Sequence, residues 1–269
     1  MAARAIVVET LEKYFPPARS GWRALLQPIA RPTLCALAGV SFFVEPGEAV
    51  ALIGENGAGK STLLRVLATL ILPTRGRAQI AGYDVAREGA GARRQLGYYT
   101  SGDEGFYGRL TGRENLRLFA AMNNLRPAQA TLRIGELGEL LGVGGILDRQ
   151  ARGYSTGMLQ RLGLARALLH APSVLLLDEP TRSLDPLAAA EFRRFLKTEI
   201  MGRLGTTLLF ASHTLSEVEE MATRVVLLAE GRVRACDTPR NLCAKTGAAH
   251  LEQALEYLVP RPSPAGTAG

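Results

Sequence analysis

The sequence is poor in the residues that cross-link a chain or hold metals. Its 269 residues include three cysteines, three histidines and one tryptophan. Cys35, Cys236 and Cys243 form no CxxC pair, so we expect neither a disulfide framework nor a thiolate metal site. A reducing cytoplasm is the expected environment for such a chain.

Long apolar runs are also missing. The apolar runs, such as those at residues 174–177 and 208–211, fall far short of the roughly 18 residues that a membrane-spanning helix needs. Near the start, Glu9 interrupts the chain before an apolar stretch reaches the length of a signal-peptide core. We therefore expect a soluble protein that is at most peripheral to a membrane.

The composition that remains is that of a folded, basic protein. Hydrophobic residues make up 47% and charged residues 21%, which excludes a disordered, collagen-like or disulfide-stapled chain. The length allows one large domain or two small ones. The net charge of +7 fits an anionic partner, whether nucleotide, phospholipid or nucleic acid, and does not choose among them.

Short apolar runs alternate with longer segments of helical period, which predicts an α/β fold with a mainly parallel sheet. Residues 49–53, 174–177 and 208–211 are nearly all apolar, as expected for strands buried on both faces. Residues 225–235 and 76–82 each contain a turn typical of a hairpin. An antiparallel patch is therefore expected beside the parallel core.

Three other segments complete the predicted organisation. Helical spacing prevails over residues 112–170, which we interpret as a helical subdomain inserted between two core strands. Residues 15–33 carry four prolines and are interpreted as an inserted loop. The main domain is expected to span residues 1–245, and residues 246–269 to form a short helix and a disordered tail.

A glycine-rich turn follows the first buried strand and precedes a helix whose predicted apolar stripe is Leu63, Val66, Leu67 and Leu70. Residues 54–61 match the pattern G-x-x-x-x-G-K-[ST] in the context that supports a phosphate-binding loop. Lys60 supplies a cation for the β- and γ-phosphates, and Ser61 a hydroxyl for Mg²⁺. The predicted nucleotide contacts are Gly54, Glu55, Asn56, Gly57, Ala58, Gly59, Lys60, Ser61 and Thr62.

Polar side chains follow two other strands. Asp178 and Glu179 end the run 174–177, where open α/β sheets bind ligands. We expect Asp178 to hold Mg²⁺ and Glu179 to polarise the attacking water, the alternative being a turn cap and a solvated acid. His213 follows residue 211 and is expected to contact the γ-phosphate or that water, although a purely structural polar residue is the alternative.

Three further segments resemble one family, the ATP-binding subunits of ABC transporters. Residues 154–161 resemble its signature motif, residues 179–186 its D-loop, and residues 211–213 its switch histidine. The resemblance covers residues 4–240 and implies a nucleotide-binding core, an antiparallel β patch and a helical subdomain. The phosphate loop alone is shared by many ATPases and GTPases, but the ordered set is highly specific.

The resemblance also implies that two subunits pair head to tail around two ATP molecules. The partner in that pair is a second copy or a related ATP-binding subunit. Each γ-phosphate would then meet Lys60 of one chain and the helix start formed by Ser155, Thr156 and Gly157 of the other, with Asp185 nearby. An N-cap that only satisfies its own helix is the alternative for Ser155.

An aromatic residue near the amino terminus stacks on adenine in this family. Tyr14 is the best match, with Phe15 in reserve and core packing as the alternative.

Two departures from the family pattern stand out. The usual Mg²⁺-contacting glutamine is missing from residues 99–105, where Asp103 or Glu104 is expected to supply the oxygen. Tyr154, Thr156 and Met158 vary the signature, and Arg182 replaces a usual serine. Together with residues 109–116, these variants are similar to exporter-type subunits of the ABC-2 class.

The leading hypothesis is an ATPase that drives export of an unidentified substrate through a separate membrane permease, at the cytoplasmic face of the membrane. One alternative is a non-transport ABC ATPase acting as a mechanical switch on ribosomes or DNA, but those proteins usually carry tandem cassettes or coiled coils. Another is a kinase or GTPase, which leaves the signature unexplained. We expect no nucleic-acid partner. Trp22 and the basic residues of the loop fit a membrane headgroup surface or a permease contact, with a solvated loop as the alternative.

Overall fold

The computed structural model describes residues 4–16, 34–101 and 105–259, and a six-stranded sheet lies at its centre. The strand order is β10-β9-β3-β8-β7-β6, and every neighbouring pair is parallel except β9 and β10. The strands are β3 (Ala49–Ile53), β6 (Leu96–Thr100), β7 (Val174–Asp178), β8 (Thr207–Ala211), β9 (Arg224–Ala229) and β10 (Arg232–Asp237). The predicted mainly parallel sheet is confirmed.

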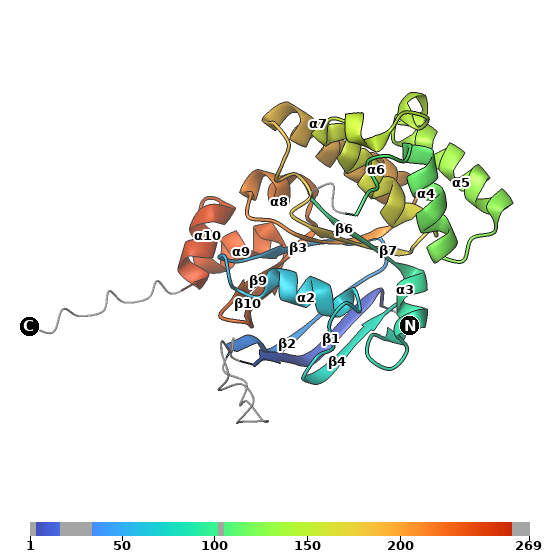
Figure 1. Ribbon diagram of the computed structural model, residues 1–269. Coiled ribbons are helices and arrows are strands. Elements are labelled where there is room, and N and C mark those ends of the chain that lie inside the picture. Colours follow the sequence, from blue (N-terminus) through green and yellow to red (C-terminus); the bar gives the residue numbers. More distant parts are fainter. Residues whose placement is uncertain (1–3, 17–33, 102–104, 260–269) are drawn as a thin grey trace, which may run out of the picture.

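A second, antiparallel sheet packs below the first (Figure 1). Its order is β2-β1-β4-β5, formed by β1 (Ile6–Phe15), β2 (Leu34–Val44), β4 (Arg75–Ile80) and β5 (Tyr83–Asp84). The predicted antiparallel patch is therefore confirmed, and the hairpin of β4 and β5 belongs to it. The other predicted hairpin, β9 with β10, instead forms the edge of the large sheet.

Helix α2 (Lys60–Leu67) lies between the two sheets (Figure 1). Leu63, Leu64, Val66 and Leu67 are buried in a core that both sheets share. The prediction of Leu70 on the apolar stripe was wrong, because Thr69 adopts a left-handed conformation with φ of 60° after the helix has ended. Leu70 is consequently 61% exposed.

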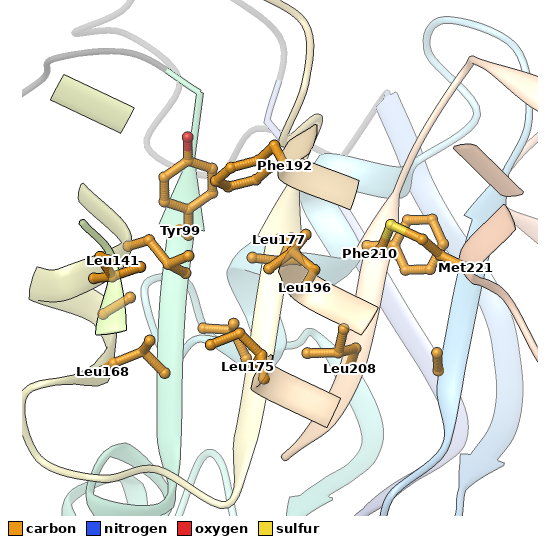
Figure 2. Close-up of a cluster of buried hydrophobic side chains, with 14 of the residues drawn as sticks. Tyr99, Leu141, Leu168, Leu175, Leu177, Phe192, Leu196, Leu208, Phe210 and Met221 are labelled. Carbon is orange, nitrogen blue, oxygen red and sulfur yellow. The ribbon is translucent and has the colours of Figure 1, made fainter. Parts of the chain in front are cut away.

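The other face of the six-stranded sheet carries the helical subdomain. Between the neighbouring strands β6 and β7 the chain forms α4 (Gly112–Met122), α5 (Pro127–Leu140) and α6 (Thr156–Leu168), as the sequence predicted. Thr111 and Glu114 close a capping box at the start of α4. Tyr99 and Phe192 meet in the core at this face, with 6.1 Å between ring centroids (Figure 2).

Besides the 3₁₀ turns η1 (Gly144–Ile146) and η2 (Ala151–Gly153), six further helices of the described residues complete the fold. They are α3 (Gly89–Gln95), α7 (Pro186–Phe195), the π-helix η3 (Leu196–Arg203), α8 (Leu215–Met221), α9 (Pro239–Thr246) and α10 (Leu251–Leu258). The expected domain boundary at residue 245 falls within α9. Leu242 of α9 and Leu251 of α10 are both part of the main core, so the short helix near the carboxyl terminus packs on the same domain.

Several expectations concern residues beyond the described ranges. Residues 17–33 of the predicted loop, Trp22 among them, and the predicted tail from residue 260 lie outside those ranges. Strand β1 continues to Phe15, so the segment between β1 and β2 begins at Pro16. All three cysteines lie within the described ranges and are free, as the sequence predicted. Among the described helices, none has the length and apolar character to cross a bilayer.

Candidate functional site

The phosphate-binding loop predicted at residues 54–61 joins β3 to α2 in the structure. Gly59 has a φ of 105°, and a Cβ there would lie 2.5 Å from the carbonyl oxygen of Ala36, so only glycine fits. As the residue before α2, Gly59 provides no side-chain cap for the helix. The first N–H groups of α2 therefore have no side-chain acceptor at the N-cap, which suits an anion such as phosphate.

Lys60 is buried inside this loop. Its Nζ donates to the carbonyl oxygen of Gly54 at 2.6 Å and to that of Glu55 at 3.1 Å. Burial lowers the pKa of Lys60 below its usual value, while the charges of Glu179 and Asp178 oppose that shift. Since a buried ammonium is poorly solvated, an anion entering the loop gains a strong electrostatic partner.

Ser61 and Asp178 meet across the site. The Ser61 hydroxyl donates to Oδ1 of Asp178 at 3.1 Å, which joins the start of α2 to the end of β7. Burial raises the pKa of Asp178, an effect that the bond from Ser61 opposes. These oxygen donors suit Mg²⁺. In the described part of the chain, no group of three or more acidic, His or Cys residues is placed to hold a metal ion.

Glu179 lies beside Asp178 at the edge of the sheet. Its N–H donates to the carbonyl oxygen of Ala211 at 3.1 Å, because β7 and β8 run in parallel with Asp178 opposite Ala211. Its Oε1 is 3.4 Å from Nδ1 of His213. The two strand ends thus bring together the predicted catalytic acid and the predicted switch histidine, as expected for parallel neighbours.

The predicted signature segment, Ser155 to Gly157, lies at the start of α6 and not beside the phosphate-binding loop. Ser155 caps α6, and its hydroxyl accepts a hydrogen bond from the N–H of Met158 at 3.3 Å. Ser155 and Thr156 are exposed, and Gly157 is half-buried. Helix α6 packs with Leu175 and Leu177 on one face of the large sheet, whereas α2 packs with Val174 and Leu176 on the other. The segment therefore presents its helix start to solvent on the face opposite α2.

Comparison with known proteins agrees with this arrangement. The family model described as "ABC transporter" matches residues 37–182. The ABC transporter ATP-binding protein NatA of Bacillus subtilis is 36% identical over 198 residues, which are 74% of this chain and 80% of NatA. The chain belongs to the ABC transporter family.

Two further comparisons extend this result. The daunorubicin resistance ATP-binding protein DrrA2 of Streptomyces coeruleorubidus is 39% identical over 220 residues, which are 81% of this chain and 66% of DrrA2. Among solved structures, CbiO1 of Clostridium perfringens, described as part of the ABC transporter complex CbiONQ, has a TM-score of 0.76. It is 25% identical and the match covers 91% of this chain and 92% of CbiO1. The chain is accordingly an ABC-type ATPase that binds nucleotide.

Two residues predicted from the family pattern are Tyr14, which lies near the phosphate-binding loop, and Asp185, which lies at the start of α7. Tyr14 is half-buried on β1, paired with Cys35 of β2, and the next residue of β2, Ala36, contacts Gly59 as described above. Asp185 is exposed and caps α7 by accepting from the N–H groups of Leu187 and Ala188 at 3.1 and 3.0 Å. Asp103 and Glu104, the predicted substitutes for the missing glutamine, lie outside the described residues.

Sequence reasoning missed two polar contacts around Glu179. The Nη1 of Arg182 lies 3.1 Å from Oε2 of Glu179. Glu217, only 1% exposed, accepts a hydrogen bond from Thr181 at 3.1 Å, and burial raises its pKa. The unusual arginine in the D-loop was visible in the sequence, but its contact with Glu179 was not. The second contact had no signal, because an acid on a helix is most often solvated.

Tyr98 was also missed. Burial, reinforced by the charge of Asp178, raises the pKa of Tyr98 to about 12, so its phenol remains protonated beside that carboxylate. Tyr98 lines a cavity of about 390 Å³ together with Ser61, Asp178 and Glu179. The cavity is thus bordered by the predicted Mg²⁺ ligands on one side and the predicted catalytic acid on another.

Proposed function

We propose that this chain is the ATP-hydrolysing subunit that powers export through a separate membrane permease. The observation that carries the proposal is the meeting of Lys60, Ser61, Asp178, Glu179 and His213 at one edge of the sheet. The names of the relatives support the direction of transport, since DrrA2 is described as a daunorubicin resistance protein. The cargo would contact the permease and not this chain.

The chemistry follows from the positions of the side chains. Lys60 and the N–H groups at the start of α2 bind the β- and γ-phosphates of ATP. Glu179 accepts a proton from a water molecule whose oxygen attacks the γ-phosphorus, while the bond to the β–γ bridging oxygen breaks and ADP leaves. His213, beside Glu179, orients that water or the γ-phosphate. Mg²⁺ held by Ser61 and Asp178 would neutralise charge on the phosphate oxygens.

A second ATP-binding subunit completes the site. We assign Ser155, Thr156 and Gly157 of that subunit to the γ-phosphate, because the start of α6 is exposed and carries the positive end of the helix dipole. Asp185, exposed at the start of α7, would border the same interface, and Tyr14 would stack on adenine. The second subunit is a copy of this chain or a close relative. This arrangement explains why the segment lies on the face of the sheet away from α2.

The membrane partner is an integral permease, and this chain lies against it at the cytoplasmic face. The name of DrrA2, a daunorubicin resistance ATP-binding protein, supports this placement. The experiment is affinity purification from detergent-solubilised membranes, with the Glu179→Gln variant and ATP to stabilise the assembly. We expect one polytopic protein of roughly six spans to co-purify. Recovery of ribosomes or DNA instead would overturn the export proposal in favour of a mechanical switch.

A further inference from the structure

The D-loop begins with a tight turn that folds an arginine back onto the predicted catalytic acid. The N–H of Arg182 donates to the carbonyl oxygen of Glu179 at 3.2 Å, which closes the turn. The same arginine places its Nη1 3.1 Å from Oε2 of Glu179. Backbone and side chain therefore both direct Arg182 at Glu179.

The two oxygens of this carboxylate face different partners. Oε2 lies against Arg182, and Oε1 lies 3.4 Å from Nδ1 of His213. The Glu179 side chain is only 18% exposed, whereas those of Arg182 and His213 are 68% and 56% exposed. The buried acid is thus in ion-pair contact with a guanidinium that is itself largely in water, and the contact lacks hydrogen-bond geometry, since Oε2 has no hydrogen-bond partner among the described residues. An ion pair of this kind is weak enough to be opened by a competing contact.

Arg182 also lies between two cavities. It borders the cavity of about 390 Å³ that Ser61 and Asp178 line, and a second cavity of about 310 Å³ that Thr181 and His213 line. Its exposed head can therefore leave Glu179 without disturbing the buried part of the site. Lys60 is already the buried cation of the phosphate loop, so Arg182 is not needed to supply one.

We propose that Arg182 is a positioning residue that restrains Glu179 and slows ATP hydrolysis by the isolated subunit. While Oε2 of Glu179 is held against the guanidinium, that oxygen is not available to the attacking water. Contacts made when the ATP sandwich closes would draw the guanidinium away and free Oε2 for the water. The inference rests on the proposed role of Glu179 as the proton acceptor.

The test compares ATP hydrolysis by Arg182→Gln, Arg182→Ser and Arg182→Lys with that of the unaltered chain at saturating ATP and Mg²⁺. We expect kcat to rise about two- to fivefold in the Gln and Ser variants, the factor by which an exposed ion pair can bias an equilibrium, with KM for ATP unchanged. Lysine should restore the low rate. The Gln-to-unaltered ratio should approach one as KCl is raised, because salt screens the pair.

The matched control is Arg194→Gln, which removes the same charge from an exposed position on α7. It should leave kcat unchanged. Thermal denaturation of each variant separates a folding defect from a change in rate.

Two outcomes keep this inference separate from the proposed function. If Glu179→Gln is inactive but Arg182→Gln hydrolyses ATP at or below the unaltered rate, the restraint is wrong and the role of Glu179 stands. If Glu179→Gln hydrolyses ATP at the unaltered rate, the role of Glu179 fails and the restraint fails with it.

Discussion

Lys60 illustrates what single residues contribute to this site. The lysine is 6% exposed, and its burial lowers its pKa, so the fold accepts an electrostatic cost in order to keep a cation inside the loop. The loop carbonyl oxygens of Gly54 and Glu55 offset part of that cost. A residue that is costly to the fold and close to the predicted phosphate site is typical of a binding function.

Replacing Lys60 by alanine should therefore separate binding from stability. We expect Lys60→Ala to bind ATP about 100-fold more weakly, because two charge-assisted contacts to phosphate are lost, and to hydrolyse none. The melting temperature should stay the same or rise. Isothermal titration with ATP and Mg²⁺ measures the affinity.

The control for this prediction is Lys197→Ala, in which an exposed lysine of η3 is removed. It should bind and hydrolyse ATP as the unaltered chain does. Retention of tight ATP binding by Lys60→Ala would contradict the assignment of the loop.

Residues with a fixed spacing could be predicted from the sequence, whereas residues defined by their surroundings could not. The order of Gly54, Gly59, Lys60 and Ser61 follows from how a backbone wraps around phosphate, so the pattern alone indicates the chemistry. The contact of Thr181 with Glu217 joins residues 36 positions apart, and nothing local specifies it. The contact of Arg182 with Glu179 depends on a turn that the pattern does not describe.

At the scale of elements, parallel strands explain why residues far apart in the sequence meet. Strands β7 and β8 end opposite each other, which brings the acidic pair after Leu177 to the histidine after Ser212. The buried strands were predictable because both of their faces are apolar. The end of α2 was not predictable, because the left-handed conformation of Thr69 has no clear sequence signal.

One acid at the end of β10, Asp237, joins that strand to α9. Asp237 accepts hydrogen bonds from Lys245 and Asn241 at 2.7 Å and from the N–H of Thr238 at 2.8 Å. These contacts, with Lys245 the largest cause, lower the pKa of Asp237 from 3.8 to about 2. Because the folded state favours the carboxylate, its stabilising effect is complete above pH 3.8 and is lost as the pH falls towards 2.

We therefore expect Asp237→Asn to lower the free energy of unfolding by about 1 kcal/mol at pH 7 and the melting temperature by about 2–3 °C. The difference from the unaltered chain should shrink as the pH is lowered below about 4. Urea denaturation from pH 7 down to about pH 3 measures it. Glu191→Gln, at an exposed position of α7, is the control and should change little. A difference that does not vary with pH would contradict this account.

The start of α6 has one observed role, the helix cap made by Ser155, and one proposed role, binding the phosphate held by the other subunit. A substitution of Ser155 can separate the two roles. Aspartate is as good an N-cap as serine, so Ser155→Asp should keep α6 stable, with a melting temperature close to that of the unaltered chain. Its negative charge would oppose a phosphate held across the interface. We expect the variant to bind ATP as a monomer but to lose ATP-dependent dimerisation, measured by analytical ultracentrifugation.

The control is Thr238→Asp, which makes the same change at the N-cap of α9. This variant should dimerise normally. If Ser155→Asp formed ATP-dependent dimers as readily as Thr238→Asp, the assignment of the α6 start to the other subunit's phosphate would be wrong.

At the scale of the whole molecule, the main sheet separates the two halves of the predicted ATP site. Helix α2 lies between the sheets and α6 lies in the helical subdomain on the opposite face (Figure 1). The sequence predicted both α2 and the helical subdomain, because each has its own local pattern. The cargo had no comparable signal, since in the proposed function the permease makes those contacts.

The central claim is that two ATP-binding subunits close around ATP. The most direct measurement is light scattering after gel filtration of Glu179→Gln, which should bind ATP without turning it over. With ATP and Mg²⁺ we predict a species of twice the 28.8 kDa chain mass. Without nucleotide, or in the double variant that also carries Lys60→Ala, we predict the monomer. A Glu179→Gln chain that carries bound ATP yet remains at 28.8 kDa would contradict the account.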